Sequence, residues 1–311
     1  MKYCFGVDVG GTTVKMGLFE ENGTILDKWE IVTHTEEEGK AILPDISASI
    51  LEKIKEKKLN KDDIAGIGVG VPAPVTEEGI VDGSANLGWN YKNVRKELEE
   101  LTGMHAEIGN DANVAALGEM WKGGGAGQKN MVMVTLGTGV GGGIIIGGRV
   151  LTGAHGAGGE IGHICVNYEE TDSCGCGNHG CLEQYTSATG IVRLAKKKLE
   201  NETRNTMLNI ESVSAKDVFD AVKAGDEVAI EIAEVFGRYL GHGLANLAAV
   251  ADPAFFVIGG GVSKAGEVLI PYIQKPYLER AFFADKDVKF ALATLGNDAG
   301  ICGAAKLVLG D

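Results

Sequence analysis

The sequence predicts an α/β protein that is built from two related lobes. The first observation is a strand, a turn of glycine and threonine, and a second strand within residues 3–19. The second observation is the same plan in residues 131–146, about 125 residues later. The third is the alternation of apolar strands with helix-like stretches. With 311 residues, 44% of them hydrophobic, the chain can bury more than one ordinary core, so two lobes are expected.

The remaining elements follow from apolar periodicity and from turn residues. Helix-like stretches at 39–58 and 93–101 flank the apolar strand Ile64–Val71. After the second hairpin we expect an irregular Gly/His/Cys-rich region at 152–183, helices at 187–201 and 226–250, a strand at 255–258, and a helix at 298–309. The last helix is expected to pack back on the first lobe. The predicted lobes are therefore residues 1–112 plus 297–311, and residues 113–296.

Charge and cysteine usage limit the classes of function. The net charge of −14 repels polyanions, which argues against extended nucleic-acid binding. Asp8 interrupts any signal-peptide apolar stretch, and no uncharged apolar run reaches the ~18 residues of a membrane span. We therefore expect a cytoplasmic protein without membrane or nucleic-acid partners. In that compartment the six cysteines are expected to be thiols or metal ligands and not disulfides.

The first turn combines a carboxylate with small residues. Asp8 precedes Gly10, Gly11 and Thr12, and Lys15 follows. Glycines let backbone N–H groups approach phosphate oxygens, a threonine hydroxyl adds a donor, and Asp8 can hold Mg²⁺. A tight hairpin with a surface aspartate would contain the same glycines, so this turn alone leaves both interpretations open.

The second turn and a third glycine segment are also candidates for nucleotide contacts. Gly137, Thr138 and Gly139 open the second hairpin, and Gly259–Gly261 follow the apolar strand at 255–258. A flat adenine or ribose can approach the backbone at such a strand-to-helix connection. An ordinary tight connection without a nucleotide would have the same sequence. The two hairpin turns together predict a grip on a polyphosphate more strongly than either does alone.

A candidate general base precedes a helix-compatible run at 114–121. Asp111 follows Asn110 and lies where the N-cap of this helix is expected. Asparagine and aspartate are common N-caps, so a purely structural role at this position is the alternative. A helix N-terminus stabilises a carboxylate and makes it a weak base. That suits phosphoryl transfer, where the hydroxyl proton leaves late and the carboxylate mainly orients the hydroxyl.

The most specific pattern in the chain is a group of metal-ligating residues. Cys174, Cys176 and Cys181 lie within eight residues, with His163 eleven residues earlier and His179 between the cysteines. Three cysteines and one histidine suit tetrahedral zinc. Four protein ligands would close the coordination shell, so such a zinc ion is structural.

These residues together resemble the ROK family of bacterial sugar kinases, within the hexokinase, Hsp70 and actin superfamily, over nearly the whole chain. The first turn is similar to the family's first phosphate loop, and residues 136–143 with Gly153, Gly156 and Gly159 are similar to its signature segment. The resemblance implies two ribonuclease-H-like lobes with an active-site cleft between them, Mg-ATP as a substrate, and a homodimer.

The resemblance also implies roles for single residues. Asp111 becomes the catalytic base, Gly259–Gly261 contact the nucleotide, and His163, not His179, becomes the fourth zinc ligand. The implied sugar-binding residues are Asn86, Asn110, Asp111, Glu160, His163 and Glu183. Zinc would then fix the loop that carries Glu160 and Glu183.

The predicted function is an ATP-dependent hexose kinase that converts glucose and ATP into glucose 6-phosphate and ADP. The segment at 85–89 resembles the glucokinase version of the family motif. N-acetylglucosamine, N-acetylmannosamine, allose and fructose are alternative acceptors, and polyphosphate is an alternative donor. A non-catalytic sugar sensor or regulator is the alternative from another class. A sugar-responsive repressor of the family would carry a DNA-binding module ahead of the first turn, and a sugar-binding scaffold without catalysis would lack Asp111 or a phosphate loop, both of which are present.

Overall fold

The structure is a computed structural model that describes residues 2–310. It divides into two compact units. Unit 1 is Met1–Lys129, Gly143–Gly159 and Leu295–Asp311, and unit 2 is Asn130–Gly142 and Glu160–Thr294. The bounds differ from those of the predicted lobes, because the helix after Asn110 packs against the last helix within unit 1. The functional lobe boundaries stay a prediction.

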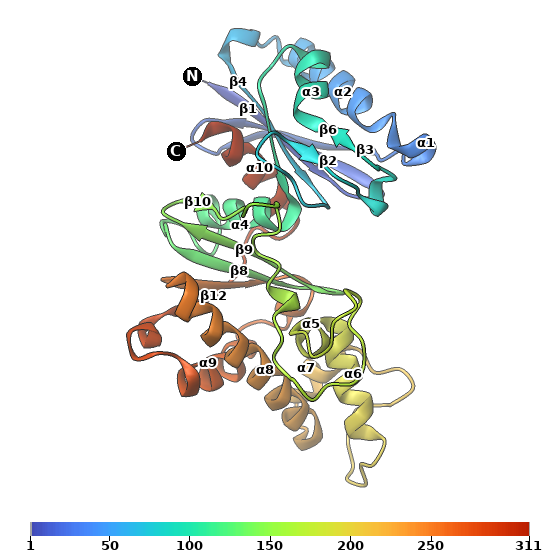
Figure 1. Cartoon of the computed structure of the whole chain (residues 1–311), viewed down its shortest axis with the longest axis vertical. Helices are drawn as coiled ribbons and strands as arrows, with labels where there is room; N and C mark the ends of the chain where they lie inside the picture. The colour runs from blue at the N-terminus through green and yellow to red at the C-terminus, as the bar shows by residue number, and fades with distance from the viewer. Residues whose placement is uncertain (1, 311) are drawn as a thin grey trace. The chain divides into compact units, whose positions relative to one another are not determined.

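Five strands form the first sheet, in the order β3-β2-β1-β4-β7. Their bounds are β1 Tyr3–Val9, β2 Thr13–Glu20, β3 Ile25–Val32, β4 Ile64–Val71 and β7 Ala106–Asn110. The pairs β1–β2 and β2–β3 are antiparallel, whereas β1–β4 and β4–β7 are parallel. The first predicted hairpin is therefore confirmed, and it forms one side of a mixed sheet (Figure 1).

Helices cover both faces of this sheet. The helices of unit 1 are α1 Glu36–Gly39, α2 Ile42–Lys57, α3 Val94–Thr102, α4 Asp111–Lys122 and α10 Ala299–Leu309. On one face Phe5 and Val7 of β1 share a core with Ile46 of α2 and Leu98 of α3. On the other face Cys4 of β1 packs with residues of α10. A short ladder of β5 Ile80–Val81 and β6 Lys92–Asn93 completes the unit.

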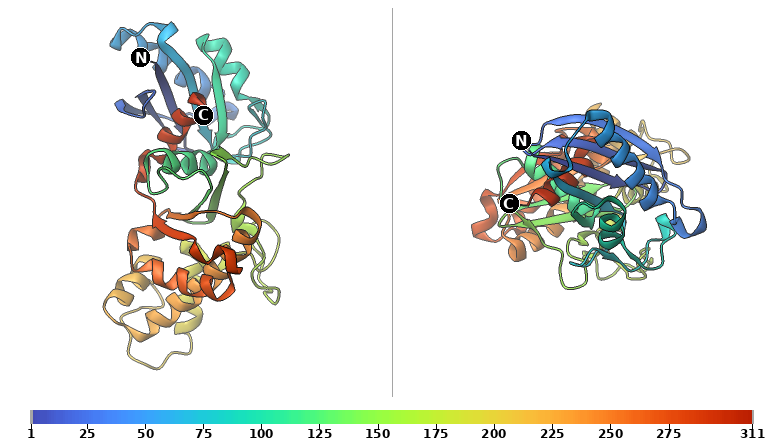
Figure 2. Two further views of the ribbon diagram at one scale, coloured as in Figure 1. Left: turned by 90° about the vertical axis from the view of Figure 1, so that its left-hand side faces the viewer. Right: turned by 90° about the horizontal axis from the view of Figure 1, so that it is seen from above.

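The last helix lies directly on glycines of the sheet. A Cβ atom on Gly6 would lie 2.0 Å from the carbonyl oxygen of Ile301, and one on Gly68 would lie 1.7 Å from that of Ala304. A Cβ atom on Gly303 of α10 would lie 1.6 Å from the carbonyl oxygen of Val114 in α4. Larger residues would therefore push α10 off the sheet. The red helix α10 lies beside the blue strand β1 in Figures 1 and 2, which confirms its predicted packing.

The second sheet has the strand order β10-β9-β8-β11-β12. The bounds are β8 Met131–Leu136, β9 Val140–Ile146, β10 Arg149–Val150, β11 Phe255–Gly259 and β12 Lys289–Leu292. Strand β11 runs parallel to both β8 and β12. The rings of Phe256, Tyr277 and Phe290 contact one another in the core of unit 2, with centroids 5.2–5.6 Å apart.

Unit 2 is richer in helices than the sequence patterns predicted. Its helices are α5 Glu183–Thr186, α6 Ala188–Leu199, α7 Ala215–Lys223, α8 Glu227–Ala251 and α9 Leu269–Arg280. The predicted helices at 187–201 and 226–250 correspond to α6 and α8 and are confirmed. Among residues 2–310, no helix combines the length and the apolar character needed to cross a bilayer.

Candidate active site and metal centre

The first glycine turn is held by its own sheet. The N–H of Gly10 donates to the carbonyl oxygen of Thr13 at 3.0 Å. The hydroxyl of Thr33, at the end of β3, donates to the carbonyl oxygen of Gly10 at 2.7 Å, and its N–H donates to that of Thr12 at 2.9 Å. Backbone and a buried threonine therefore fix this turn.

Asp8 lies at the end of β1, opposite Lys15 of β2. A Cβ atom on Gly300, in the first turn of α10, would lie 2.6 Å from the Asp8 carboxyl carbon, so this glycine leaves room for the carboxylate. Burial raises the pKa of Asp8, and Lys15 offsets part of that rise. A half-buried carboxylate that lacks full charge compensation is a suitable ligand for a magnesium ion.

Asn110, not Asp111, is the N-cap of α4. The Asn110 side-chain oxygen accepts from the N–H groups of Ala112 at 3.0 Å and Asn113 at 3.2 Å. The predicted cap at Asp111 is therefore wrong by one residue, because Asn110 has extended backbone and can reach both N–H groups. Asp111 is the first helical residue, and its Oδ1 accepts from Ala112 N–H at 2.8 Å. The helix dipole thus stabilises the Asp111 carboxylate.

Asn86 lies in a short 3₁₀ helix, Ala85–Leu87, and is exposed. Ser84 and Trp89 exchange backbone hydrogen bonds across this helix at 2.8 and 3.1 Å. The indole of Trp89 is buried and donates to the carbonyl oxygen of Gly39 at 3.2 Å. A Cβ atom on Gly11 would lie 3.3 Å from the Asn86 carbonyl oxygen, so unit 1 brings the first glycine turn and Asn86 together.

The second glycine turn is held by residues from a different part of unit 2. The N–H of Gly137 donates to the carbonyl oxygen of Gly139 at 2.9 Å. The N–H of Ala188 donates to the carbonyl oxygen of Gly137 at 2.8 Å. The hydroxyl of Thr189 donates to the carbonyl oxygen of Thr138, also at 2.8 Å. The start of α6 therefore fixes this turn, and no sequence pattern pointed to Ala188 or Thr189.

Glu183 also contacts the second turn. Its Oε2 accepts from the N–H of Val140 at 2.9 Å. A Cβ atom on Gly139 would lie 2.2 Å from the same oxygen. The other carboxylate oxygen lies 3.7 Å from the Sγ atom of Cys174, which donates to it. Glu183 was predicted as a sugar-binding residue, and the prediction did not include its contacts with the second turn and with Cys174.

The third glycine segment lies next to the second turn. Gly259 pairs with Thr135 at the carboxyl ends of the parallel strands β11 and β8. Gly260 has a φ of +83°, and a Cβ atom there would lie 2.5 Å from the Leu136 carbonyl oxygen. Because only glycine adopts this conformation freely, the backbone of β11 can turn tightly beside the end of β8.

A cavity of about 360 Å³ opens beside Gly261. Its walls are mainly apolar and come from three segments of unit 2, the start of α6, the helix α7, and the 3₁₀ helix Val262–Ala265. Phe219, Ala215 and Val262 line it, Lys264 adds positive charge, and the charge of Lys216 is paired with that of Asp220. The size and apolar walls suit a flat heterocycle. Sequence reasoning did not find α7, although Ser214 and Asp217 form a capping box that marks its start.

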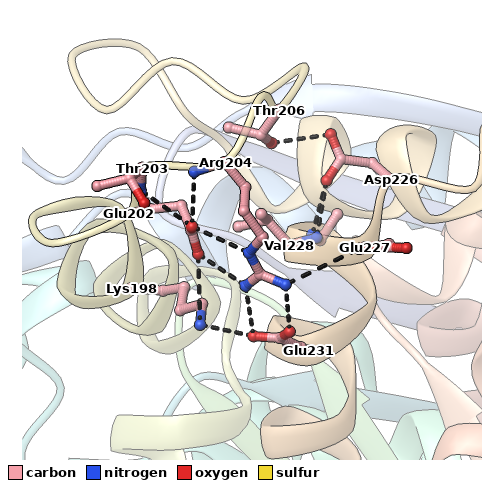
Figure 3. Close-up of polar contacts among 10 residues, drawn as sticks. Lys198, Glu202, Thr203, Arg204, Thr206, Asp226, Glu227, Val228 and Glu231 are labelled. Carbon is pink, nitrogen blue, oxygen red and sulfur yellow. Dashed lines mark hydrogen bonds and ion pairs between the residues drawn. The ribbon is translucent and has the colours of Figure 1, made fainter.

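Ion pairs fasten the loop that leads into α7 (Figure 3). The guanidinium of Arg204 donates to Glu202 at 2.8 Å and to Glu231 of α8 at 2.7 Å. Asp226, the N-cap of α8, accepts from the hydroxyl of Thr206 at 2.8 Å and from the N–H of Met207 at 2.6 Å. The loop at 202–207 is thereby attached to the first turns of α8.

Four predicted metal ligands form one cluster. The ligand atoms of His163, Cys174, Cys176 and Cys181 all lie within 4.8 Å of one another. The Sγ atoms of Cys176 and Cys181 are 3.7 Å apart, and Nδ1 of His163 lies 3.8 Å from Sγ of Cys174. Tetrahedral zinc with bonds of about 2.3 Å to sulfur requires sulfur atoms about 3.8 Å apart. The residues therefore fit a zinc ion, and His179 is exposed outside the cluster.

The thiols of the cluster differ in acidity. Burial raises the pKa of Cys181 to about 12 and also raises the pKa of Cys174. The N–H of Asn178 lowers the pKa of Cys176. The thiols of Cys174 and Cys181 thus hold their protons at neutral pH in the metal-free cluster, and a metal ion that binds there must displace those protons.

The predicted site residues fall into two groups. Unit 1 holds Asp8, Gly10, Gly11, Thr12, Lys15, Asn86, Asn110 and Asp111. Unit 2 holds Gly137, Thr138, Gly139, Glu160, His163, Glu183, the three cysteines of the cluster, and Gly259–Gly261. Within unit 2, the structure brings Glu183, the second turn and the metal cluster into contact. Glu160 is exposed, and its carbonyl oxygen accepts from the N–H of His163 at 3.2 Å.

Comparisons with known proteins agree on one family. The sequence model of the ROK family matches residues 4–311 of this chain. The chain is 43% identical to a glucokinase of Halalkalibacterium halodurans, across 99% of this chain and 95% of that protein. A ROK family glucokinase from Streptomyces griseus, solved with glucose and AMPPNP, is 33% identical with a TM-score of 0.74, and the match covers 97% of this chain and 98% of that one.

A ROK hexokinase from Thermus thermophilus is 31% identical with a TM-score of 0.80, and the match covers 98% of this chain and 97% of that one. These neighbours have the sugar-kinase fold of the actin, hexokinase and Hsp70 superfamily. The predicted fold class is therefore confirmed.

Proposed function

The chain belongs to the ROK family, and we propose that it is an ATP-dependent glucokinase that forms glucose 6-phosphate and ADP. The observation that carries this proposal is the presence, in one chain, of two glycine turns and of a carboxylate, Asp111, at a helix N-terminus next to Asn110. The names of the relatives support glucose as the acceptor and ATP as the donor.

The chemistry is a transfer between two oxygens. The 6-hydroxyl oxygen of the sugar forms a bond to the γ-phosphorus while the bond from that phosphorus to the β–γ bridging oxygen breaks. The hydroxyl proton goes to the Asp111 carboxylate, and ADP leaves with the bridging oxygen. The Asn110 cap keeps α4 starting at Asp111, so the position of the base is set by backbone hydrogen bonds. A magnesium ion held by Asp8 would neutralise charge on the phosphates.

The other roles follow the two groups of residues. Gly10, Gly11, Thr12 and Lys15 from unit 1 and Gly137, Thr138 and Gly139 from unit 2 are the proposed phosphate contacts. Gly259–Gly261 and the 360 Å³ cavity beside them are the proposed adenosine site. The proposed sugar ligands, besides Asp111, are Asn86, Asn110, Glu160, His163 and Glu183. Paired amides and carboxylates suit the hydroxyls of a hexose, each of which donates and accepts.

We propose that the cluster of His163 and three cysteines holds zinc. Four protein ligands leave no open position, so the ion would act on structure alone. Its place in the irregular region at 160–183 supports a role in ordering Glu160 and Glu183. Cytoplasmic location, a role in glycolysis and a homodimer stay predictions.

The test is coupled ADP release from Mg-ATP across a panel of hexoses, with Asp111→Asn beside the wild type. Asparagine keeps the shape of the side chain and removes the base, so kcat/KM is expected to fall by about 10²–10⁴-fold. The matched control is Asp62→Asn, an exposed aspartate in the 3₁₀ helix Lys61–Asp63 of unit 1, which should leave turnover unchanged.

Each outcome decides between the candidates. Turnover led by glucose supports the glucokinase proposal. Turnover led by N-acetylglucosamine, N-acetylmannosamine, allose or fructose would replace glucose as the acceptor, and turnover with polyphosphate would add a donor. Folded, metal-loaded protein that turns over none of the sugars would contradict the proposal and favour the non-catalytic sugar sensor.

A further inference from the structure

Glu183 stands between two parts of the site that have separate proposed tasks. One carboxylate oxygen accepts from the N–H of Val140 in the second glycine turn at 2.9 Å. The other lies 3.7 Å from the Sγ atom of Cys174. Cys174 can donate to this oxygen only while its thiol is protonated, so in the metal-loaded cluster the connection runs through the chain, because Glu183 follows Cys181 by two residues.

The second turn is shaped around this carboxylate. A Cβ atom on Gly139 would lie 2.2 Å from Oε2 of Glu183, so a larger residue there would have to displace this carboxylate. The Glu183 backbone contributes as well, since its carbonyl oxygen accepts from the hydroxyl of Ser187 at 2.8 Å. Ser187 immediately precedes Ala188 and Thr189, which hold the carbonyl oxygens of Gly137 and Thr138.

We propose that Glu183 is a positioning residue for the nucleotide, through which the metal cluster sets the shape of the second glycine turn. A hydrogen bond from a backbone N–H to a carboxylate is charge-assisted, and its loss would leave the N–H of Val140, a buried residue, without this partner. The inference rests on the proposed role of this turn in phosphate binding. The inference distinguishes Glu183 from the other proposed sugar ligands, because it predicts that substitution of Glu183 changes nucleotide affinity even when no sugar is present.

The first experiment measures the Kd of Mg-ADP and of a non-hydrolysable ATP analogue by calorimetry, without sugar, for zinc-loaded wild type, Glu183→Ala, Glu183→Gln and Glu169→Gln. Glu183→Ala should weaken nucleotide binding by about tenfold, because the turn loses its acceptor. Glu183→Gln should stay within about twofold of the wild type, because the amide oxygen still accepts from Val140. Glu169→Gln removes one exposed carboxylate from the same irregular region and should change nothing.

Sugar affinity, measured on the same variants, separates the two roles of Glu183. If Glu183 also binds sugar, Glu183→Gln weakens glucose binding while it retains nucleotide binding. Equal nucleotide affinity of Glu183→Ala and the wild type would overturn the inference and leave the proposed function intact. A wild type that binds no nucleotide would remove the proposed function, and the inference with it.

The second experiment repeats the titrations after the metal has been removed with a chelator, with circular dichroism to verify that the protein stays folded. Metal removal should weaken nucleotide binding in the wild type and have a much smaller effect in Glu183→Ala, because the connection is already lost. Equal effects of metal removal in both proteins would show that the cluster acts by another route, and the inference would be wrong.

Discussion

The two glycine turns have similar sequences and differ in what holds them. Residues 10–12 are fixed by backbone hydrogen bonds within β1–β3 and by the hydroxyl of Thr33. Residues 137–139 are fixed by the start of α6 and by Glu183, which lies beside the metal cluster. Both turns connect neighbouring strands of a sheet, but the first is held within its own sheet, whereas the second is also held by an irregular region that a metal ion can order.

Because of this difference, we expect the two turns to keep their shape under different conditions. A sheet forms whenever the unit folds, because its hydrogen bonds are part of the core. An irregular region lacks the hydrogen-bond ladder of a sheet and depends more on added constraints such as a metal ion. Perturbations of the metal cluster should therefore reach the second turn and spare the first.

The largest expected effect follows from metal removal. Binding of a structural zinc contributes on the order of 10 kcal/mol to the fold of its region. After chelation, backbone amides of residues 138–142 and of the cluster loop should lose protection against hydrogen exchange, while residues 10–13 keep theirs. Hydrogen-exchange mass spectrometry of zinc-loaded and chelated protein measures both turns in one sample. Equal loss of protection in both turns would contradict the comparison.

The next largest effect comes from glycine substitutions. Gly6→Ala places a methyl group against the backbone of Ile301, which cannot move without displacing α10, so the free energy of unfolding should fall by about 3 kcal/mol or more. Gly139→Ala meets a side-chain carboxylate, so Glu183→Ala in the same chain should relieve part of the cost. Denaturant unfolding of the single and double variants measures this, and strict additivity at residue 139 would argue against the observed contact.

Removing one hydroxyl from each turn should have a smaller effect. Thr33→Val deletes the hydrogen bond to the Gly10 carbonyl oxygen, and Thr189→Val deletes the bond to the Thr138 carbonyl oxygen. Each should lower the free energy of unfolding by about 1 kcal/mol. Because Thr33 is buried and Thr189 is exposed, the loss at Thr33 should be the greater of the two in thermal unfolding. The reverse order would show that burial does not set the cost.

The smallest effect concerns Asp8 and has the opposite sign. Burial raises the pKa of Asp8 above its unfolded value, so the ionised carboxylate destabilises the ligand-free protein at pH 7. Asp8→Asn should therefore raise the free energy of unfolding slightly, although it removes the proposed magnesium ligand. The gain should shrink as the pH falls below the raised pKa and vanish below the unfolded-state value, where the wild-type carboxyl is neutral in both states. Unfolding curves at pH 4 and pH 7, without nucleotide, provide the measurement.

The sequence predicted the long and strongly patterned elements of both units. The hairpins at 3–19 and 131–146, the strand at 64–71, the helices α2, α6 and α8, and the last helix all have clear periodicity, and each was found. Helix α9 was missed because it contains Pro276, a residue that normally ends a helix. Strands β7 and β12 have five and four residues, too few to show a period.

The chemistry of the site was predictable where residues lie close in the chain. The cysteines of the metal cluster are within eight residues, and the structure brings them together with His163 as expected. The contact of Glu183 with Val140 joins residues 43 positions apart and has no local pattern. The cap at Asn110 was missed because Asn and Asp are both good caps, and only the backbone conformation distinguishes them.

The packing of α10 on Gly6 and Gly68 affects the order in which the two units can fold during synthesis. Strand β1 is among the first elements to be made, and α10 is the last. Until α10 arrives, one face of the first sheet lacks its cover, so unit 1 can complete its core only after the rest of the described chain has been synthesised. Unit 2 contains no part of α10 and can fold earlier. In the order of biosynthesis, the unit that begins the chain is the last to finish.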